Sequence, residues 1–252
     1  MSYFSVDNVS IQFGGLKAID SVSFDVEKGQ IFTIIGPNGA GKTTLFNLIS
    51  RLYNVSTGRI LFKDQEITKL SAQQIAGLGI ARTFQNIELF ENASTLQNLL
   101  VGRHTHSDTN FLEDILFLPR MRRAELVHRR AVEEVMDFLQ LQRYRDTLIG
   151  GLPYGVRKVV EVGRALCIGP EVLLLDEPSS GLNVEETDRM ADWILEINRR
   201  LGITILMVEH DMSLVSRVSD RVLALNYGRI MAQGTSQEVQ SHPDVVAAYL
   251  GA

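Results

Sequence analysis

The segment GPNGAGKT, which begins at Gly36, has the residue types and the spacing of a phosphate-binding loop. Gly36, Gly39 and Gly41 let the backbone curl so that successive N–H groups face one anion. Lys42 offers a point charge to the β- and γ-phosphates of a nucleotide, and the hydroxyl of Thr43 can bind Mg²⁺. Because an apolar strand precedes the loop and a helix follows it, the segment predicts a phosphate site rather than an ordinary glycine-rich turn.

Two adjacent carboxylates form a second candidate group, at the end of the apolar segment VLLLDEP. If this segment is a strand, Asp176 and Glu177 lie at its carboxyl end, where α/β folds bind ligands. Asp176 is then placed to hold Mg²⁺ directly or through water, and Glu177 is a candidate general base for an attacking water. Acidic residues often begin loops, so this pair alone is modest evidence for a ligand site. The phosphate loop in the same chain makes that evidence strong.

His210 and Gln85 are weaker candidates. His210 follows an apolar segment whose carboxyl end, in a parallel sheet, reaches the same edge as Lys42 and Asp176. Its imidazole can donate a hydrogen bond to a γ-phosphate there, although a lone histidine after a strand is more often a loop residue. Gln85 can contact Mg²⁺ and water, whereas most glutamines are simply solvated. Neither residue identifies a site without the other motifs.

The elements that must position these residues alternate between strands and helices. Alternating apolar residues near the N-terminus predict antiparallel β structure, and the continuously apolar run IFTII predicts a strand covered on both faces. The fold class is therefore α/β, a P-loop NTPase core with an N-terminal antiparallel β subdomain and an inserted α-helical subdomain. We expect helices over about 42–52, from about 71, and over 94–101, 111–117, 120–141, 155–167, 184–201 and 212–218. We expect strands over 59–64, 172–176 and 203–209, and a hairpin over 221–234. Two short helices should follow at the C-terminus, the first capped by Ser236 or Thr235.

The composition is that of an ordinary globular protein of 252 residues, 45% hydrophobic and 22% charged. A net charge of −5 predicts no strongly basic surface for nucleic acid, although a local patch stays open. One cysteine excludes an intrachain disulfide framework and fits a reducing compartment. We expect no secretory signal and no membrane span, because the N-terminus lacks a basic segment followed by an apolar core and no apolar run reaches about 18 residues.

Taken together, the order and spacing of these motifs resemble the nucleotide-binding subunits of ABC transporters, over nearly the whole chain. The resemblance implies ATP and Mg²⁺ as ligands, with Lys42 in the Walker A motif and Gln85 in the Q-loop. It places Asp176 and Glu177 in the Walker B motif and makes His210 the switch histidine. The implied catalytic residues are Glu177, His210 and Lys42, the implied Mg²⁺ ligands are Thr43, Gln85 and Asp176, and the implied nucleotide-binding residues are Phe13, Gly36, Pro37, Asn38, Gly39, Ala40, Gly41, Lys42, Thr43, Thr44, Gln85 and Asp176.

Phe13 falls where the family places the aromatic residue that stacks on adenine. A phenylalanine ring can stack as well as the commoner tyrosine. Packing of Phe13 in the core beneath its strand is the alternative.

The segment LPYGV departs from the family pattern. By position it aligns with the LSGGQ signature, which closes over the γ-phosphate of an ATP held by a second subunit. Gly155 is retained, but Pro153 stands in the place of serine, Tyr154 replaces a glycine and Val156 replaces glutamine. The resemblance therefore implies two chemically unequal ATP sites, and an ordinary loop-to-helix junction remains the alternative.

Asn183 is a second departure, because the D-loop of the family usually ends in aspartate. Asn183 lacks that charge but can still form a hydrogen bond across a subunit interface. It also suits the N-cap of the following helix, with Glu186 three residues later completing a capping box. The two roles are compatible.

Finer sequence features resemble the ATPase subunits of branched-chain amino-acid importers and their relatives for other amino acids, amides and urea. These features are FGGLKAIDSVSF, LPRMRRAE, SSGLN, VEHDM and HPDVVAAYLG. The resemblance implies one ABC nucleotide-binding domain over 1–252, with its core at about 1–90 and 168–252 and its helical subdomain at about 91–167. It further implies a peripheral protein at the cytoplasmic face of the inner membrane.

The implied partners are a second ATP-binding subunit, reached through the Gly155 loop and the Asn183 D-loop, two transmembrane permease subunits, and indirectly a periplasmic or surface solute-binding protein. No nucleic acid partner is expected. The pair of ATPase subunits is expected to be a heterodimer. The transported solute stays open, because an ATPase subunit does not touch it.

Two other functions stay open. One is a nucleotide-gated regulatory ABC subunit with weak hydrolysis, which the altered signature favours. The other is a soluble ABC ATPase outside transport, although such proteins generally need a coiled-coil insertion or two fused ATPase domains. A nucleotide kinase is a weaker possibility, since no acceptor site is evident.

Overall fold

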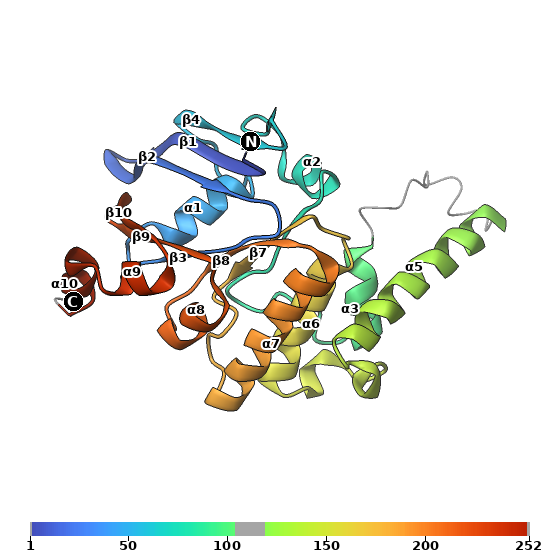
Figure 1. The fold of residues 1–252 in the computed structure, drawn as a ribbon. Helices are drawn as coiled ribbons and strands as arrows, with labels where there is room; N and C mark the ends of the chain where they lie inside the picture. The colour runs from blue at the N-terminus through green and yellow to red at the C-terminus, as the bar shows by residue number, and fades with distance from the viewer. Residues whose placement is uncertain (1, 104–118, 251–252) are drawn as a thin grey trace. The chain divides into compact units, whose positions relative to one another are not determined.

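The computed structural model describes residues 2–103 and 119–250. The chain divides into two compact units, one formed by residues 1–85 and 171–252 and the other by residues 86–170. Their elements are drawn in Figure 1. The helix expected over 111–117 lies outside the described residues. Within the described ranges, no helix is both long and apolar enough to cross a membrane.

The first sheet of the larger unit is antiparallel, as the alternating N-terminal pattern predicts. Its strands, in spatial order, are β2, β1, β4 and β5. β1 pairs with β2 on one side and with β4 on the other. Apolar residues on one face of β1, such as Phe4, Val6 and Val9, are buried. The strands are β1 (Phe4–Phe13), β2 (Leu16–Val26), β4 (Thr57–Phe62) and β5 (Gln65–Glu66).

The second sheet carries the carboxyl-terminal edge expected for a nucleotide site. Its spatial order is β10-β9-β3-β8-β7-β6, and the pairs from β9 to β6 are parallel. Every residue of β3, β7 and β8 is buried, which explains why their sequences are almost entirely apolar. The strands are β3 (Ile31–Ile35), β6 (Ile80–Arg82), β7 (Val172–Asp176), β8 (Thr204–Val208), β9 (Arg221–Asn226) and β10 (Arg229–Gly234).

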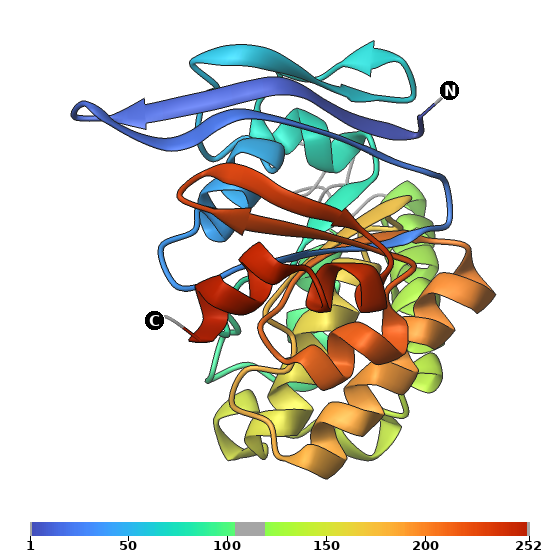
Figure 2. The same ribbon diagram turned by 60° about the vertical axis from the view of Figure 1, so that its left-hand side comes forward.

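Helix α1 (Lys42–Ile49) lies between the two sheets, as both Figure 1 and Figure 2 show. Leu45, Phe46 and Leu48 are fully buried in one core cluster with residues of both sheets. The helix ends three residues before the predicted Leu52. Arg51 has a φ of 59°, a left-handed conformation that a right-handed helix cannot contain.

The other face of the parallel sheet is covered by helices that follow its strands. Val215 of α8 and Val239 of α9 pack with Ile35 and Val222 in a second apolar cluster. Thr235, one of the two residues predicted to cap this helix, is the N-cap of α9. The helices of this unit besides α1 are α2 (Ala72–Gly77), α7 (Val184–Leu201), α8 (Met212–Val218), α9 (Ser236–Gln240) and α10 (Pro243–Leu250).

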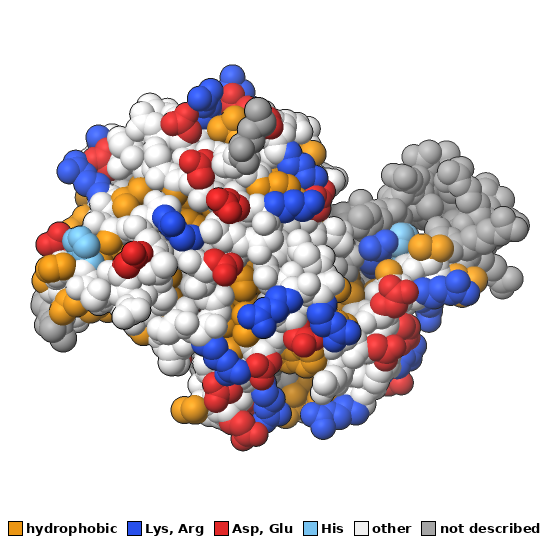
Figure 3. All heavy atoms as spheres, viewed as in Figure 1, with side chains coloured by type: hydrophobic (Ala, Val, Ile, Leu, Met, Phe, Trp, Pro, Cys, Tyr) orange, Lys and Arg blue, Asp and Glu red, His pale blue; other side chains and the backbone are white. Residues whose placement is uncertain are grey.

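Figure 3 shows acidic and basic side chains interspersed over α7. Glu185 pairs with Arg189 and Glu196 with Arg200, each at 2.8 Å and each one helical turn apart. Arg217 of α8 reaches two acidic residues of α7. Such exposed pairs contribute little stability individually, so they describe a solvated face.

The smaller unit is helical, with α3 (Thr95–Gly102), α5 (Pro119–Phe138) and α6 (Tyr154–Leu166), and with 3₁₀ turns at Gln142–Tyr144 and Ile149–Gly151. α3 approaches α6 closely, because a Cβ at Gly102 would lie 2.3 Å from the carbonyl oxygen of Arg164. α5 ends at Phe138 rather than at the predicted 141. Gln140 has a φ of 56°, which stops the helix.

The predicted fold class, an α/β P-loop core with an N-terminal antiparallel sheet and an inserted helical part, is confirmed. The hairpin over 221–234 is also found, as β9 and β10. Two strands were not predicted, β5 and β6. β6 is three residues long and ends in an arginine, so it carries almost no apolar pattern.

Candidate nucleotide-binding site

The phosphate-binding loop runs from the end of β3 to the start of α1. At two of its positions, a glycine lies so close to neighbouring backbone that no side chain would fit. A Cβ at Gly36, whose φ is 154°, would lie 2.3 Å from the carbonyl oxygen of Leu225. At Gly41, whose φ is 102°, a Cβ would lie 2.7 Å from the carbonyl oxygen of Ala18. The loop therefore packs closely against β2 and the β9–β10 hairpin, which leaves room only for glycine at these two positions.

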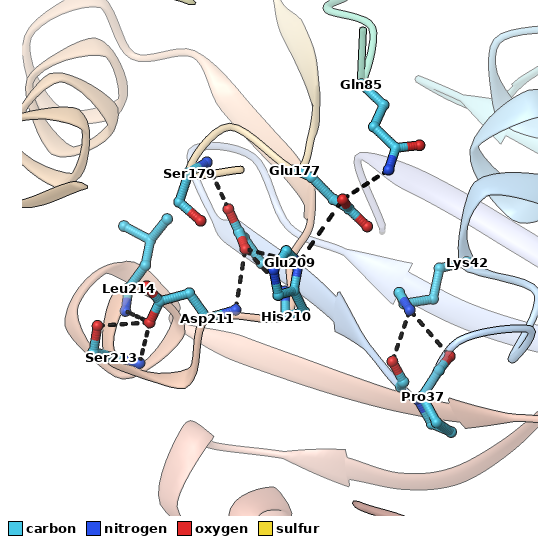
Figure 4. A network of polar contacts seen from close by, with 11 residues as sticks. Pro37, Lys42, Gln85, Glu177, Ser179, Glu209, His210, Asp211, Ser213 and Leu214 are labelled. Carbon is cyan, nitrogen blue, oxygen red and sulfur yellow. Dashed lines mark hydrogen bonds and ion pairs between the residues drawn. The ribbon is translucent and has the colours of Figure 1, made fainter. Parts of the chain in front are cut away.

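Lys42 is folded back on this loop. Its Nζ donates to the carbonyl oxygens of Gly36 (2.7 Å) and Pro37 (3.1 Å), as Figure 4 shows. Burial lowers the pKa of Lys42, while the nearby charges of Glu177 and Asp176 act in the opposite direction. A bound phosphate would offer this amino group charged oxygens in place of the two carbonyl oxygens, and hydrogen bonds to charged oxygens are stronger.

Asp176 is buried at the carboxyl end of β7, with 1% of its surface exposed. Its Oδ2 accepts a hydrogen bond of 2.7 Å from Nη2 of Arg82. Its Oδ1 is buried and accepts none from the described residues. A buried carboxylate oxygen without a donor is costly, so this atom is a candidate for a ligand.

Glu177 has a φ of 48°, a left-handed conformation that is strained for a residue other than glycine. Its backbone N–H donates to the carbonyl of Val208, which fixes the turn after β7 against β8. The Nε2 of Gln85 donates to its Oε2 at 2.9 Å, and Nδ1 of His210 lies 3.8 Å from the same oxygen. The structure thus brings Glu177 between Gln85 and His210 (Figure 4).

Glu209 connects two loops at this edge, although it is fully buried. One carboxylate oxygen accepts from the backbone N–H of Ser179, at 2.9 Å. The other accepts from the N–H groups of His210 (2.8 Å) and Asp211 (3.2 Å). Glu209 therefore fixes the loop of His210 to the loop that follows Glu177 (Figure 4).

Phe13 ends β1 with 46% of its surface exposed, so it is not a core residue. Its ring meets the ring of Tyr53 edge to face, with centroids 5.4 Å apart. The two half-exposed rings form an apolar surface on which a planar base can stack.

The segment LPYGV lies in the smaller unit and begins α6, with Pro153 as the N-cap. The N-cap offers no side-chain hydrogen bond, and no acidic residue lies in the first turn, so the backbone N–H groups there keep their capacity for an anion. Gly155 is in this first turn. Arg157 lies 5.7 Å from the ring of Tyr154.

Asn183 is the N-cap of α7 and forms the predicted capping box. Its side chain accepts from the N–H of Glu186 at 3.0 Å, and the carboxylate of Glu186 accepts from the N–H of Asn183 at 3.1 Å. The capping role is confirmed.

The residues at the sheet edge fit a Mg²⁺ ion that arrives with a nucleotide. Among the described residues, no group of three or more His, Cys, Asp or Glu side chains could hold a metal ion by itself. The exposed Thr43 and the open Oδ1 of Asp176 offer oxygen ligands, which Mg²⁺ prefers, and phosphate oxygens and water complete such sites.

Sequence reasoning missed Arg82 and Glu209. Each is a charged residue within or directly after a strand, and each adjoins a motif that was recognised, ARTFQ and VEH. A charge at a position expected to be buried is the signal that could have identified them.

Comparison with known proteins gives the family. The ABC transporter family model matches residues 19–180, and that of the branched-chain amino acid ATP-binding cassette transporter matches residues 229–252. BraF of Pseudomonas aeruginosa, a high-affinity branched-chain amino acid transport ATP-binding protein, is 39% identical over 249 residues, covering 98% of this chain and 96% of BraF. LivG of Escherichia coli K12 is 38% identical, covering 98% of this chain and 97% of LivG.

Solved structures that resemble this chain belong to the same family. A nucleotide-free ATP-binding cassette from an ABC transporter is 32% identical, with a TM-score of 0.88 and complete coverage of both chains. The ADP conformation of MJ1267, an ATP-binding cassette of an ABC transporter, is 31% identical, with a TM-score of 0.87 and again complete coverage. The chain therefore belongs to the ABC transporter family of ATP-binding proteins, with a C-terminal segment of the branched-chain amino acid type.

Proposed function

We propose that this chain hydrolyses ATP to power the import of branched-chain amino acids or related small solutes through partner permease subunits. The observation that carries the proposal is the meeting of Gln85, Glu177 and His210 at one sheet edge, with the Lys42 loop at the next strand end. The relatives named for branched-chain amino acid transport match nearly the whole chain. The two compact units then correspond to the core and the helical subdomain of one nucleotide-binding domain.

The proposed catalytic group is the carboxylate of Glu177. It accepts the proton of a water molecule that attacks the γ-phosphate. Its strained backbone and its contact with Gln85 fix the position of the carboxylate before ATP binds. Lys42 moves its hydrogen bonds from the loop carbonyls to the β- and γ-phosphates, and His210 donates to the γ-phosphate. Catalysis is mainly positioning and charge stabilisation.

The remaining nucleotide contacts follow from the loop and from β1. The N–H groups of residues 36–44 surround the phosphates, and the ring of Phe13 stacks on adenine beside Tyr53. Thr43, Gln85 and Asp176 are the proposed Mg²⁺ ligands. When bound, Mg²⁺ offsets charge on the phosphate oxygens.

The partner of the ATPase is a second ATP-binding subunit. In the proposed dimer, each ATP lies between the phosphate loop of one subunit and the signature helix of the other. The Gly155 loop and Asn183 belong to that interface. Two permease subunits in the membrane and a periplasmic or surface binding protein complete the transporter, and the chain is peripheral at the cytoplasmic face of the inner membrane.

A regulatory subunit with weak hydrolysis is the second candidate. It is favoured by Pro153 and Tyr154, which remove the serine and one glycine of the signature. The experiment that separates the two candidates is solute-stimulated ATP hydrolysis by the chain purified with its membrane partners. Co-purification with two permeases and stimulation by branched-chain amino acids supports the import role. Association without stimulated hydrolysis supports the regulatory role, and no association contradicts both.

Glu177→Gln tests the assigned base. The glutamine amide cannot accept the proton but keeps the size of the side chain, so we expect ATP binding to be retained and turnover to fall by about 10²-fold or more. Turnover is measured as phosphate release by the assembled transporter, and binding is measured by calorimetry. Glu196→Gln, on the exposed face of α7, is the matched control. Full turnover by Glu177→Gln would exclude this residue as a required base.

A further inference from the structure

Arg82 is a charged side chain buried inside the larger unit. It ends β6, beside β7 in the parallel sheet, and only 7% of its side chain is exposed. A guanidinium does not lose its charge at any pH that a protein survives, so its burial must be compensated by partners. The identity of those partners shows what the arginine does.

The guanidinium joins two parts of the candidate site. Its Nη2 donates to Oδ2 of Asp176 at 2.7 Å. Its Nη1 donates to Oδ1 of Asn47 at 2.8 Å and to Oγ of Ser50 at 2.7 Å. Asn47 lies in α1, the helix that begins at Lys42, and Ser50 is its C-cap. Arg82 therefore connects the carboxylate at the end of β7 to the helix of the phosphate loop.

Two aromatic rings hold the guanidinium in place. The Cζ of Arg82 lies 5.7 Å from the ring centroid of Phe46 and 5.3 Å from that of Phe84. Phe46 is fully buried in α1. A planar guanidinium suits this arrangement, because it can contact rings while its edge forms hydrogen bonds.

The hydrogen bond from Arg82 uses only one of the two carboxylate oxygens of Asp176. Oδ2 is fixed by Arg82, while Oδ1 is buried and accepts no hydrogen bond from the described residues. The backbone N–H of Asp176 donates to Oγ1 of Thr83, the residue after Arg82, which fixes the backbone as well. In metal sites, such outer contacts orient the ligating carboxylate.

We propose that Arg82 is a positioning residue that reserves Oδ1 of Asp176 for the metal of the ATP site. This inference rests on the proposed function. Arg82 also offsets the charge of Asp176, so that the carboxylates at this edge do not collect a divalent cation before ATP arrives. Metal binding is thereby coupled to nucleotide binding through α1.

The test is the Mg²⁺ dependence of ATP binding by the full chain, which requires no hydrolysis. In Arg82→Lys the charge is kept, but one ammonium cannot reach Asp176, Asn47 and Ser50 in the same fork. We expect the half-saturating Mg²⁺ concentration for tight ATP binding to rise by about tenfold or more. ATP affinity in EDTA should stay within about twofold of the unchanged chain, because the phosphate loop is intact.

Two further variants make the result specific. Arg59→Lys alters an exposed arginine that pairs with Asp7 at 2.8 Å in the same unit, and we expect no change in the Mg²⁺ dependence. Asn47→Ala leaves the pair of Arg82 and Asp176 but removes one of its anchors. We expect a smaller rise than in Arg82→Lys, and this variant carries the test if Arg82→Lys does not fold by circular dichroism.

Two outcomes would overturn the inference. The first is an unchanged Mg²⁺ dependence in folded Arg82→Lys, or in Asn47→Ala where that variant carries the test. The second is an equal loss of ATP affinity with and without Mg²⁺, which assigns Arg82 a structural role only. If the unchanged chain itself binds no ATP, the proposed function fails, and the failure is visible before any variant is compared.

Discussion

At the scale of single residues, Glu209 is a fully buried carboxylate that connects two loops of the candidate site. Its two oxygens accept from the N–H groups of Ser179, His210 and Asp211. Charge-assisted hydrogen bonds of this kind are stronger than neutral ones, and they compensate the burial of the carboxylate. The imidazole Nδ1 of His210 lies 3.9 Å from Oε2 of Glu209 and 3.8 Å from Oε2 of Glu177, so the position of His210 depends on the neighbouring Glu209.

Glu209→Gln is predicted to loosen this arrangement. The glutamine amide has one accepting oxygen, so at least one backbone N–H loses its partner, at a cost of about 1–3 kcal/mol in the free energy of unfolding. Urea denaturation measures this loss, and phosphate release by the transporter should fall as well, because the His210 loop is less fixed. Glu196→Gln, in an exposed pair, should change stability by less than about 0.5 kcal/mol. Equal effects of the two changes would contradict the role given to Glu209.

At the scale of elements, the start of α7 is fixed by its N-cap, and the phosphate loop is fixed by its contact with a hairpin. α7 begins at Val184 because Asn183 and Glu186 satisfy each other's backbone N–H groups. The phosphate loop is fixed by the β9–β10 hairpin, since the N–H of Gly228 donates to the carbonyl of Ala40 at 2.9 Å. The start of α7 is thus fixed by a local cap, whereas the phosphate loop is held by a hairpin distant in the sequence.

Asn183→Ala separates the capping role from an interface role. Loss of the cap should lower the free energy of unfolding by about 0.5–2 kcal/mol, whereas Asn183→Ser keeps a capping oxygen and should restore most of it. Thermal melts of the isolated chain measure this difference. If Asn183 also contacts the second ATPase subunit, Asn183→Ser should recover stability but not full ATPase activity in the transporter. Recovery of both would leave capping as its only role.

At the scale of the molecule, the altered signature faces the partner subunit's ATP in the proposed dimer, rather than the ATP of this chain. The chain already has one phosphate loop, and the Gly155 turn lies in the other compact unit. α6 begins there with backbone N–H groups but without the serine hydroxyl of the signature. Two unequal ATP sites are the expected consequence in the proposed dimer.

Gly155→Leu is predicted to impair the site built on the partner's phosphate loop more than the site built on Lys42. The bulky side chain blocks the approach of the helix end to a phosphate. Hydrolysis is compared in two transporters, each carrying the Glu177→Gln change or its equivalent in only one ATPase subunit, so that each site is read separately. Normal hydrolysis at both sites would make this segment an ordinary loop.

Local sequence alone predicts the phosphate loop, the carboxylates at the end of β7, the buried parallel strands and the capping box at Asn183. Each of these is encoded by neighbouring residues, through glycine freedom, continuous apolarity or the reach of a short polar side chain. The folded chain was needed to bring Gln85 and His210 to Glu177, to end α1 at Ile49, and to place Arg82 of β6 beside Asp176. The end of α1 depends on the left-handed backbone of Arg51. The other two features depend on the pairing of strands far apart in the chain, and a three-residue strand with a charged end carries no periodicity from which that pairing could be predicted.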